Sequence, residues 1–100
     1  MANKKIFAIH PGEILREEFM KPLQLSSYRL AKELKLAAPR VNDIVRERRA
    51  ITADTAVRLS KYFGMPAEFW LGLQADYDIR MAKGKIEKLK IKPHSRTAAA

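Results

Sequence analysis

The side chains Arg40, Asn42, Asp43 and Arg46 are spaced so that they lie on the outer side of one short helix. The remaining positions of this run, Val41, Ile44 and Val45, are apolar and form the inner side of the same helix. When such a helix enters the major groove, arginine pairs with guanine, asparagine pairs with adenine, and aspartate accepts from cytosine. These residue types therefore predict recognition of base edges in DNA.

A second short apolar run, at residues 26–34, precedes this helix and is joined to it by a tight connection around Lys35. Two helices this short cannot each bury an apolar face alone, so they must pack on each other and on flanking helices. This pattern is typical of a helix-turn-helix motif, in which the second helix reads the DNA.

Several neighbouring residues complete the predicted contact surface. The start of the helix at Ser27 can present a hydroxyl and backbone N–H groups to a phosphate. Alanine and proline at the start of the second helix offer only apolar contact, for instance with thymine methyl groups. The arginines after this helix would neutralise phosphates and position the protein without reading sequence. The alternative for each residue is a solvated helix surface. The predicted DNA-binding set is Ser27, Ala38, Pro39, Arg40, Asn42, Asp43, Arg46, Arg48 and Arg49.

The composition fits one small domain with a tail, because 100 residues suffice for a single core. A net charge of +9 predicts polyanionic partners, although a solvated basic surface is the alternative reading. The absence of cysteine excludes disulfides and thiolate metal sites. His10 and His94 lie far apart, and no nucleophile–base pair is visible, so we expect no enzyme, metal or cofactor. Without a long apolar segment we expect no membrane span or signal peptide, and hence a cytoplasmic protein.

Prolines, serine, threonine and glycine predict where five helices begin and end. Proline suits a first helical position, Ser/Thr oxygens cap N-termini, and glycine follows a C-terminus. We therefore predict an all-α, compact five-helix bundle with a helix-turn-helix. The boundaries rest on Pro11 and Pro22, Ser26 or Ser27, Ala38, Thr52, Gly64 and Pro66.

The predicted fifth helix carries more apolar surface than a small bundle usually covers. Trp70, Leu73, Tyr77 and Met81 follow one another at helical spacing, and Phe69 lies beside them. A stripe of this kind is commonly core. We expect part of it to be a homodimer interface formed by Phe69, Trp70, Leu73 and Tyr77. A dimer would present two recognition helices about 34 Å apart, as a palindromic operator requires.

The segment after Gly84 alternates lysines with single apolar residues and fits neither helix nor strand clearly. Its lysines could contact phosphates or keep a tail soluble. We divide the chain into a DNA-binding and dimerisation domain at residues 1–82 and a basic, partly disordered extension at residues 83–100.

Six segments resemble the HigA antitoxins of the XRE (lambda Cro and repressor-like) helix-turn-helix family. The resemblance covers about residues 7–80, and its motifs recur in the family's order. The segments are His10–Leu15, Arg29–Ala31, Arg40–Val45, Arg49–Ala56, Tyr62–Gly64 and Glu68–Leu71.

This resemblance implies a five-helix homodimer that represses its own operon and neutralises a RelE-like, ribosome-dependent mRNA endonuclease toxin. The alternative is a stand-alone XRE-type repressor without a toxin, and a non-specific nucleic-acid binder is a further one. Lys35 and Glu47 stand where the family commonly has glycine. A left-handed backbone at either position costs on the order of 1 kcal/mol, which leaves the docking of the recognition helix open.

Overall fold

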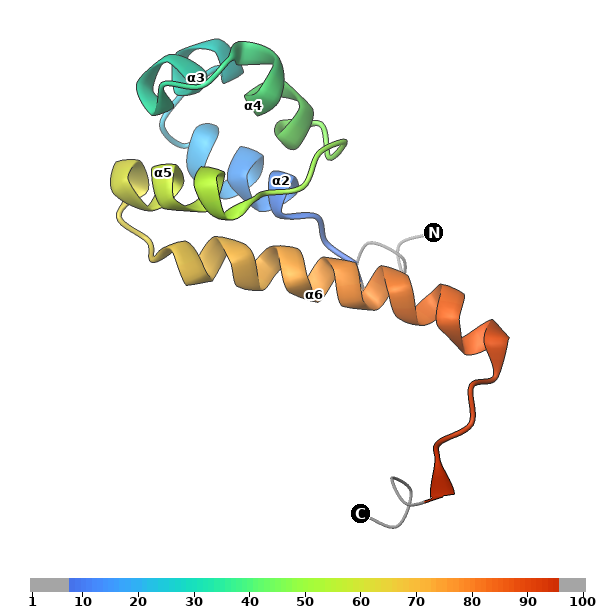
Figure 1. Cartoon of the computed structure of the whole chain (residues 1–100). Coiled ribbons are helices and arrows are strands. Elements are labelled where there is room, and N and C mark those ends of the chain that lie inside the picture. The colour runs from blue at the N-terminus through green and yellow to red at the C-terminus, as the bar shows by residue number, and fades with distance from the viewer. Residues whose placement is uncertain (1–7, 96–100) are drawn as a thin grey trace.

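The computed structural model describes residues 8–95, so predictions that concern residues 1–7 and 96–100 lie outside the described residues. The first described element is α2 (Pro11–Ile14), which continues directly as the π-helical segment η1 (Leu15–Met20). The elements that follow are α3 (Ser27–Leu34), α4 (Ala38–Val45), α5 (Ala53–Phe63), α6 (Ala67–Ile86) and the 3₁₀ turn η2 (Glu87–Leu89) (Figure 1). With η1 counted as part of the first helix, the predicted all-α fold of five helices is confirmed within residues 8–95.

Side-chain caps fix the predicted helix starts. The Nδ1 atom of His10 accepts a hydrogen bond of 2.8 Å from the Gly12 N–H at the start of α2. The Ser26 hydroxyl oxygen accepts one of 3.0 Å from the Arg29 N–H, which decides between the two candidate serines at α3. Thr52 caps α5 in the same way. The caps satisfy N–H groups that a helix leaves without an intrahelical partner.

Both helices of the predicted helix-turn-helix, α3 and α4, are followed by a residue that has a left-handed backbone and is not glycine. The backbone φ angle is 60° at Lys35, after α3, and 64° at Glu47, after α4. The Leu36 N–H reaches back to the Ala31 carbonyl at 2.9 Å, and the equivalent bond after Glu47 is 2.8 Å long. Both ends thus have the hydrogen bonds of a Schellman cap. The turn geometry is kept, and the backbone absorbs a cost of about 1 kcal/mol at each position.

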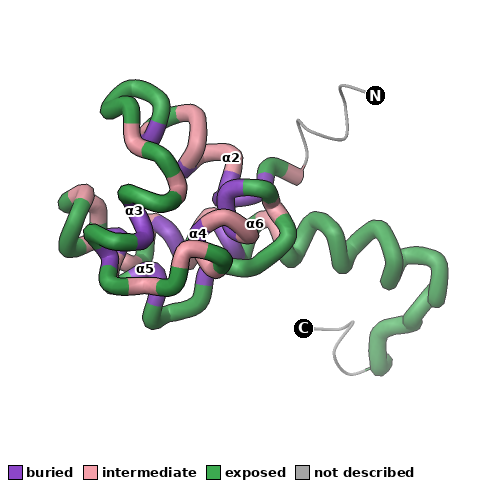
Figure 2. Tube along the Cα trace, turned by 90° about the horizontal axis from the view of Figure 1, so that it is seen from above, coloured by how far each residue is buried: buried purple, intermediate pink, exposed green. Residues whose placement is uncertain are grey.

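The core lies where all five helices meet (Figure 2). Leu15 and Met20, five residues apart, are both buried, which fits the wider turn of η1. The side chain of Gln74 is also buried, and its Oε1 atom accepts a 2.7 Å bond from the Ile51 N–H. The largest fully buried side chains come from every helix and are Trp70, Leu15, Leu30, Ile44, Leu59 and Val41.

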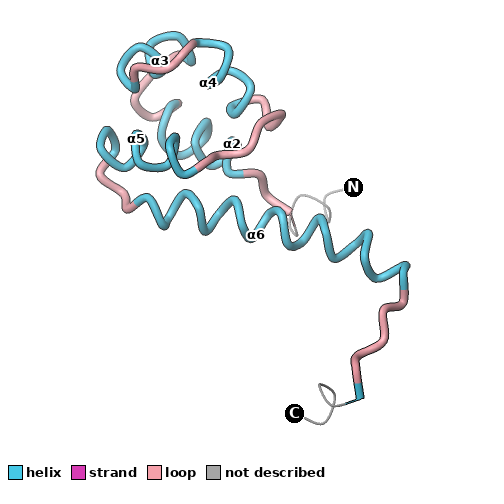
Figure 3. Tube along the Cα trace, in the orientation of Figure 1, coloured by secondary structure: helices cyan, strands magenta, loops and turns pink. Residues whose placement is uncertain are grey.

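The last helix differs from the others because only its first half rests on the body. Beyond Asp78, α6 is exposed on all sides and projects away from the other helices, followed by an irregular tail (Figures 2 and 3). The helix passes through Gly84, so the boundary between residues 82 and 83 falls inside α6, and the division into two domains stays a prediction. None of the helices described here has the length and apolarity to cross a lipid bilayer.

Candidate nucleic-acid interface

A side chain of α5 stabilises the turn between α3 and α4. Arg58 donates from its Nη1 atom to the Leu34 carbonyl at 2.8 Å and to the Lys35 carbonyl at 3.2 Å. Its Nε atom pairs with Asp54 one turn earlier at 2.9 Å. A cation at these carbonyls satisfies groups that the end of α3 leaves free. The two helices of the motif are therefore fixed to the body at their connection.

The first helix positions α4 through a direct backbone contact. A Cβ atom placed on Gly12 would lie only 1.8 Å from the Ile44 carbonyl oxygen. Two backbones can approach this closely only when no side chain stands between them. Glycine at position 12 is therefore required by the packing of α2 on α4.

Arg16 holds the other end of α4. Its Nη1 atom donates to the Val45 carbonyl in the last turn of α4, and its Nη2 atom pairs with a Glu47 carboxylate oxygen at 3.2 Å. Hydrogen bonds to Glu17, and then to Glu47, raise the pKa of the Arg16 guanidinium, so it stays charged. The left-handed Glu47 is thus tied to the helix that supports α4.

The structure brings five of the predicted DNA-binding residues together. A shallow hollow between the starts of α3 and α4 is lined by Ser27, Ala38, Pro39, Asn42 and Asp43, together with Tyr28. The Tyr28 side chain is 69% exposed and was missed by the sequence analysis. Its position two residues before buried Leu30 is the signal that places it on the outer side of α3.

Arg40 lies on a different side of α4. It lines a second hollow with Arg49 and the start of α5, and its Nη1 atom is 3.6 Å from an Asp54 carboxylate oxygen. The predicted outer surface of α4 is therefore divided, with Asn42 and Asp43 towards α3 and Arg40 towards α5.

The loop after α4 surrounds this surface with positive charge. Arg46, Arg48 and Arg49 are all exposed, and the last two each lie 3.6 Å from a carboxylate oxygen of Asp43. Exposed ion pairs of this kind contribute only about 0–1 kcal/mol and are easily exchanged for another anion. The arrangement partly neutralises Asp43 and leaves the arginines accessible to phosphates.

The expected dimer interface needs one correction. Trp70 has no exposed surface in the single chain, because it packs among Phe19, Phe63 and Phe69 with ring centroids 4.9–6.4 Å apart. It therefore belongs to the chain's own core and cannot contact a second copy directly. Phe69 and Leu73 are half-buried against the same core.

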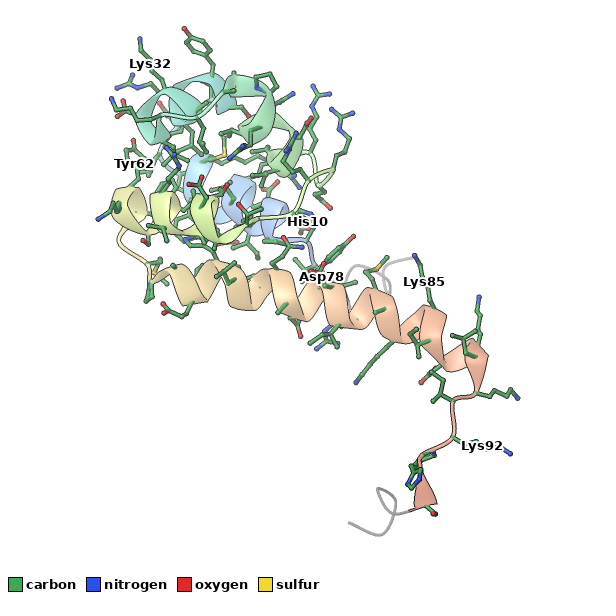
Figure 4. All side chains as sticks on the ribbon, viewed as in Figure 1. His10, Lys32, Tyr62, Asp78, Lys85 and Lys92 are labelled. Atoms are coloured by element: carbon green, nitrogen blue, oxygen red, sulfur yellow. The ribbon has the colours of Figure 1, made fainter. Side chains whose placement is uncertain are left out.

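Tyr77, the fourth residue of the expected interface, also contacts the body. Its ring meets the ring of His10 edge to face, with 4.8 Å between the centroids. Burial lowers the pKa of His10, although the carboxylates of Glu47 and Asp78 oppose the shift. Figure 4 shows His10 beside α6 near Asp78. The packing favours the neutral imidazole, which can accept the bond from Gly12.

Comparison with known proteins identifies the class of this fold. Residues 17–70 match the family model described as helix-turn-helix, and the chain belongs to this family. Virulence-associated protein I of Dichelobacter nodosus is 55% identical over 84% of this chain and 78% of that protein.

Two solved structures share both sequence and fold with the chain. The Pseudomonas aeruginosa antitoxin HigA with the higBA promoter is 50% identical, with a TM-score of 0.79 over 85% of this chain and 96% of that one. The antitoxin GraA in complex with its operator is 44% identical, with a TM-score of 0.79 over 87% and 91%. The resemblance to HigA antitoxins and the predicted helix-turn-helix fold are confirmed.

Proposed function

We propose that this chain is the antitoxin of a type II toxin–antitoxin module. In this proposal it binds a palindromic operator as a homodimer, represses its own operon and neutralises a RelE-like mRNA endonuclease. The observation that carries the proposal is the likeness to HigA, which was solved with its promoter and shares half of the matched residues. The proposal includes no catalytic activity, and it places the protein in the cytoplasm, where its DNA target lies.

In this proposal the exposed residues fall into two groups, one that contacts base edges and one that contacts phosphates. Asn42, Asp43 and Arg40 would read base edges, because their side chains reach outward from the helix that enters the groove. Ser27 and the arginines at positions 46, 48 and 49 would contact phosphates and fix the register. Ala38, Pro39 and the ring of Tyr28 would contact thymine methyl groups. Release of the weak pairs between Asp43 and its arginines would free those arginines for phosphates.

The test for DNA binding compares Arg40→Ala with Arg80→Ala. Both arginines are partly exposed and ion-paired with an aspartate, but Arg80 lies on α6, away from α4. The protein is titrated against its own upstream DNA and a scrambled duplex at two salt concentrations. We expect a preference of roughly a thousandfold for the upstream DNA in the unchanged chain. Arg40→Ala should lose about 1–3 kcal/mol of operator affinity, while Arg80→Ala stays unchanged.

Two outcomes would contradict this assignment. Equal and steeply salt-dependent binding to both duplexes would mean that charge alone attracts the protein to DNA. If Arg40→Ala weakened binding to both duplexes equally, Arg40 would contact a phosphate and not a base.

The toxin partner is tested separately. The chain is expressed together with the product of the neighbouring reading frame, which should be a small basic protein that stops growth when expressed alone. Restored growth and a stable complex on gel filtration support the antitoxin. If the operator is bound specifically but no neighbouring product associates, the chain is a stand-alone XRE-type repressor.

A further inference from the structure

Two residues of the helix-turn-helix have the same backbone conformation but different side-chain surroundings. The φ angle is 60° at Lys35 and 64° at Glu47, in a region that residues with a side chain rarely adopt. The Lys35 side chain is exposed and, within residues 8–95, makes no hydrogen bond or ion pair. The Glu47 carboxylate accepts a hydrogen bond of 3.2 Å from the Arg16 guanidinium of η1. The two positions therefore share one backbone strain, and only Glu47 has a side chain held by another helix.

The pair of Arg16 and Glu47 is partly withdrawn from water. The two side chains are 28% and 31% exposed, so their charges interact more strongly than those of a pair on the open surface. The same guanidinium donates from its Nη1 atom to the Val45 carbonyl in the last turn of α4. One side chain of η1 thus fixes both the end of α4 and the left-handed residue that follows it.

The backbone at Glu47 directs the loop after α4. The Glu47 N–H donates to the Ile44 carbonyl at 2.9 Å. The Arg48 N–H donates to the Asp43 carbonyl at 2.8 Å. The guanidinium groups of Arg48 and Arg49 then each lie 3.6 Å from a carboxylate oxygen of Asp43. The conformation of Glu47 therefore decides where the arginines of the loop lie relative to the outer side of α4.

We propose that Glu47 is a positioning residue for operator recognition, which acts through Arg16 to fix the direction of the chain after α4. This inference rests on the proposed function of the chain as an operator-binding repressor. A glycine at position 47 would adopt the left-handed backbone without strain, but it would also reach other conformations and offer Arg16 no carboxylate. A strained residue persists where its surroundings determine its conformation, and at Glu47 the ion pair supplies that constraint. The glutamate lowers the stability of the backbone and restricts the loop to one direction.

The charge of Glu47 alone predicts the opposite effect on DNA binding. Glu47 lies between Arg46 and Arg48, which are both exposed, and a carboxylate at this place repels the phosphates that the arginines attract. Removal of the charge should therefore strengthen binding to every duplex, whatever its sequence. If Glu47 positions the loop, its removal should instead weaken binding to the operator, because phosphate contacts fix the register of the recognition helix. The sign of the change separates the two roles.

The first test measures the ratio of the affinities for the chain's own upstream DNA and for a scrambled duplex. A change of net charge acts on both duplexes alike, so the ratio reports on specific contacts. Glu47→Gly should lower the ratio about tenfold, and Glu47→Ala, which keeps the left-handed strain, should lower it to the same extent. Lys35→Gly is the matched control, because it makes the same backbone change without removing an ion pair. Its ratio should stay within about twofold of the unchanged chain.

The second test measures thermal unfolding without DNA. Lys35→Gly should raise the unfolding midpoint by roughly 2–6 °C, because the left-handed strain is relieved. Glu47→Ala should lower the midpoint, because the ion pair is lost and the strain remains. Glu47→Gly should lie between these two variants, since it combines the relief with the loss. A larger rise for Glu47→Gly than for Lys35→Gly would overturn the coupling of Glu47 to Arg16. Circular dichroism checks that each variant keeps its helices.

The third test asks whether Glu47 acts through Arg16. Arg16→Lys keeps the positive charge but cannot contact the Val45 carbonyl and the Glu47 carboxylate together. If the two residues act as one unit, the double variant of Arg16→Lys and Glu47→Gly should lose no more of the affinity ratio than the weaker single variant. Losses that add would overturn the route through Arg16.

Two outcomes separate this inference from the proposed function. An unchanged ratio in both Glu47→Gly and Glu47→Ala, with the unchanged chain still selecting its upstream DNA, would overturn the positioning role alone. A ratio near one in the unchanged chain would overturn the proposed operator recognition, and the positioning role with it.

Discussion

The two halves of α6 belong to one helix but are stabilised by different surroundings. The first half places Trp70 and Gln74 inside the body, where each has a specific neighbour. The second half, after Asp78, has exposed side chains throughout. Tertiary packing supplies most of a helix's stability, so the first half should be more stable than the second in the single chain. One continuous helix thus begins in the chain's core and ends with exposed side chains.

The largest expected effect separates the two halves directly. Trp70→Ala should lower the free energy of unfolding by about 3–5 kcal/mol, because it leaves a large cavity among aromatic rings. Ile86→Ala should change it by less than about 0.5 kcal/mol at protein concentrations low enough to keep the chain monomeric. Urea denaturation measures both. Similar losses for the two variants would mean that the second half of α6 is packed in the folded monomer.

A pair of glycine changes sharpens the same contrast. Gly12→Ala should destabilise the fold by about 1–3 kcal/mol, because the added methyl group meets the Ile44 carbonyl and the backbone must move. Gly84→Ala meets open space on the exposed half of α6 and should stabilise the helix by up to about 1 kcal/mol. Thermal denaturation of the two variants should therefore shift in opposite directions. A stable Gly12→Ala chain would contradict the close approach of α2 to α4.

The smallest expected effect is a pH dependence that arises in the body. Burial lowers the pKa of His10 in the folded chain below its ordinary value of 6.5, with Glu47 and Asp78 opposing the shift. The unfolded chain then binds the proton more readily, so stability falls as the pH drops below about 6.5. The slope from this one group is at most about 1.4 kcal/mol per pH unit.

His10→Asn keeps a cap oxygen that does not titrate, so denaturation curves between pH 7.5 and 5 should show a smaller pH dependence. An unchanged slope in His10→Asn would assign the pH dependence to other groups.

Local signals in the sequence predicted the helices well because caps and helix ends depend on neighbouring residues. Thr52 and Gly64 delimit α5 by their own chemistry, and no distant contact is needed to place them. The candidate DNA surface followed from spacing alone, but the separation of Arg40 from Asn42 depends on where α5 lies. The roles of Gly12 and Arg16 were missed because each contacts residues about thirty positions away.

The apolar side of α6 shows a different limit of sequence analysis. The spacing of Trp70, Leu73 and Tyr77 revealed an apolar side but could not tell whether the chain's own body covers it.

The support of α4 by Gly12 and Arg16 has a consequence for redesigning which DNA sequence the protein selects. Both residues hold α4 from its inner side and its C-terminal end, and neither lines the hollow formed with Tyr28. The outer residues of α4 can therefore be substituted together, because the contacts of Gly12 and Arg16 keep the helix in the same orientation. Under the proposed function, substitutions on the outer side of α4 should change the operator preference while the first helix keeps α4 in place.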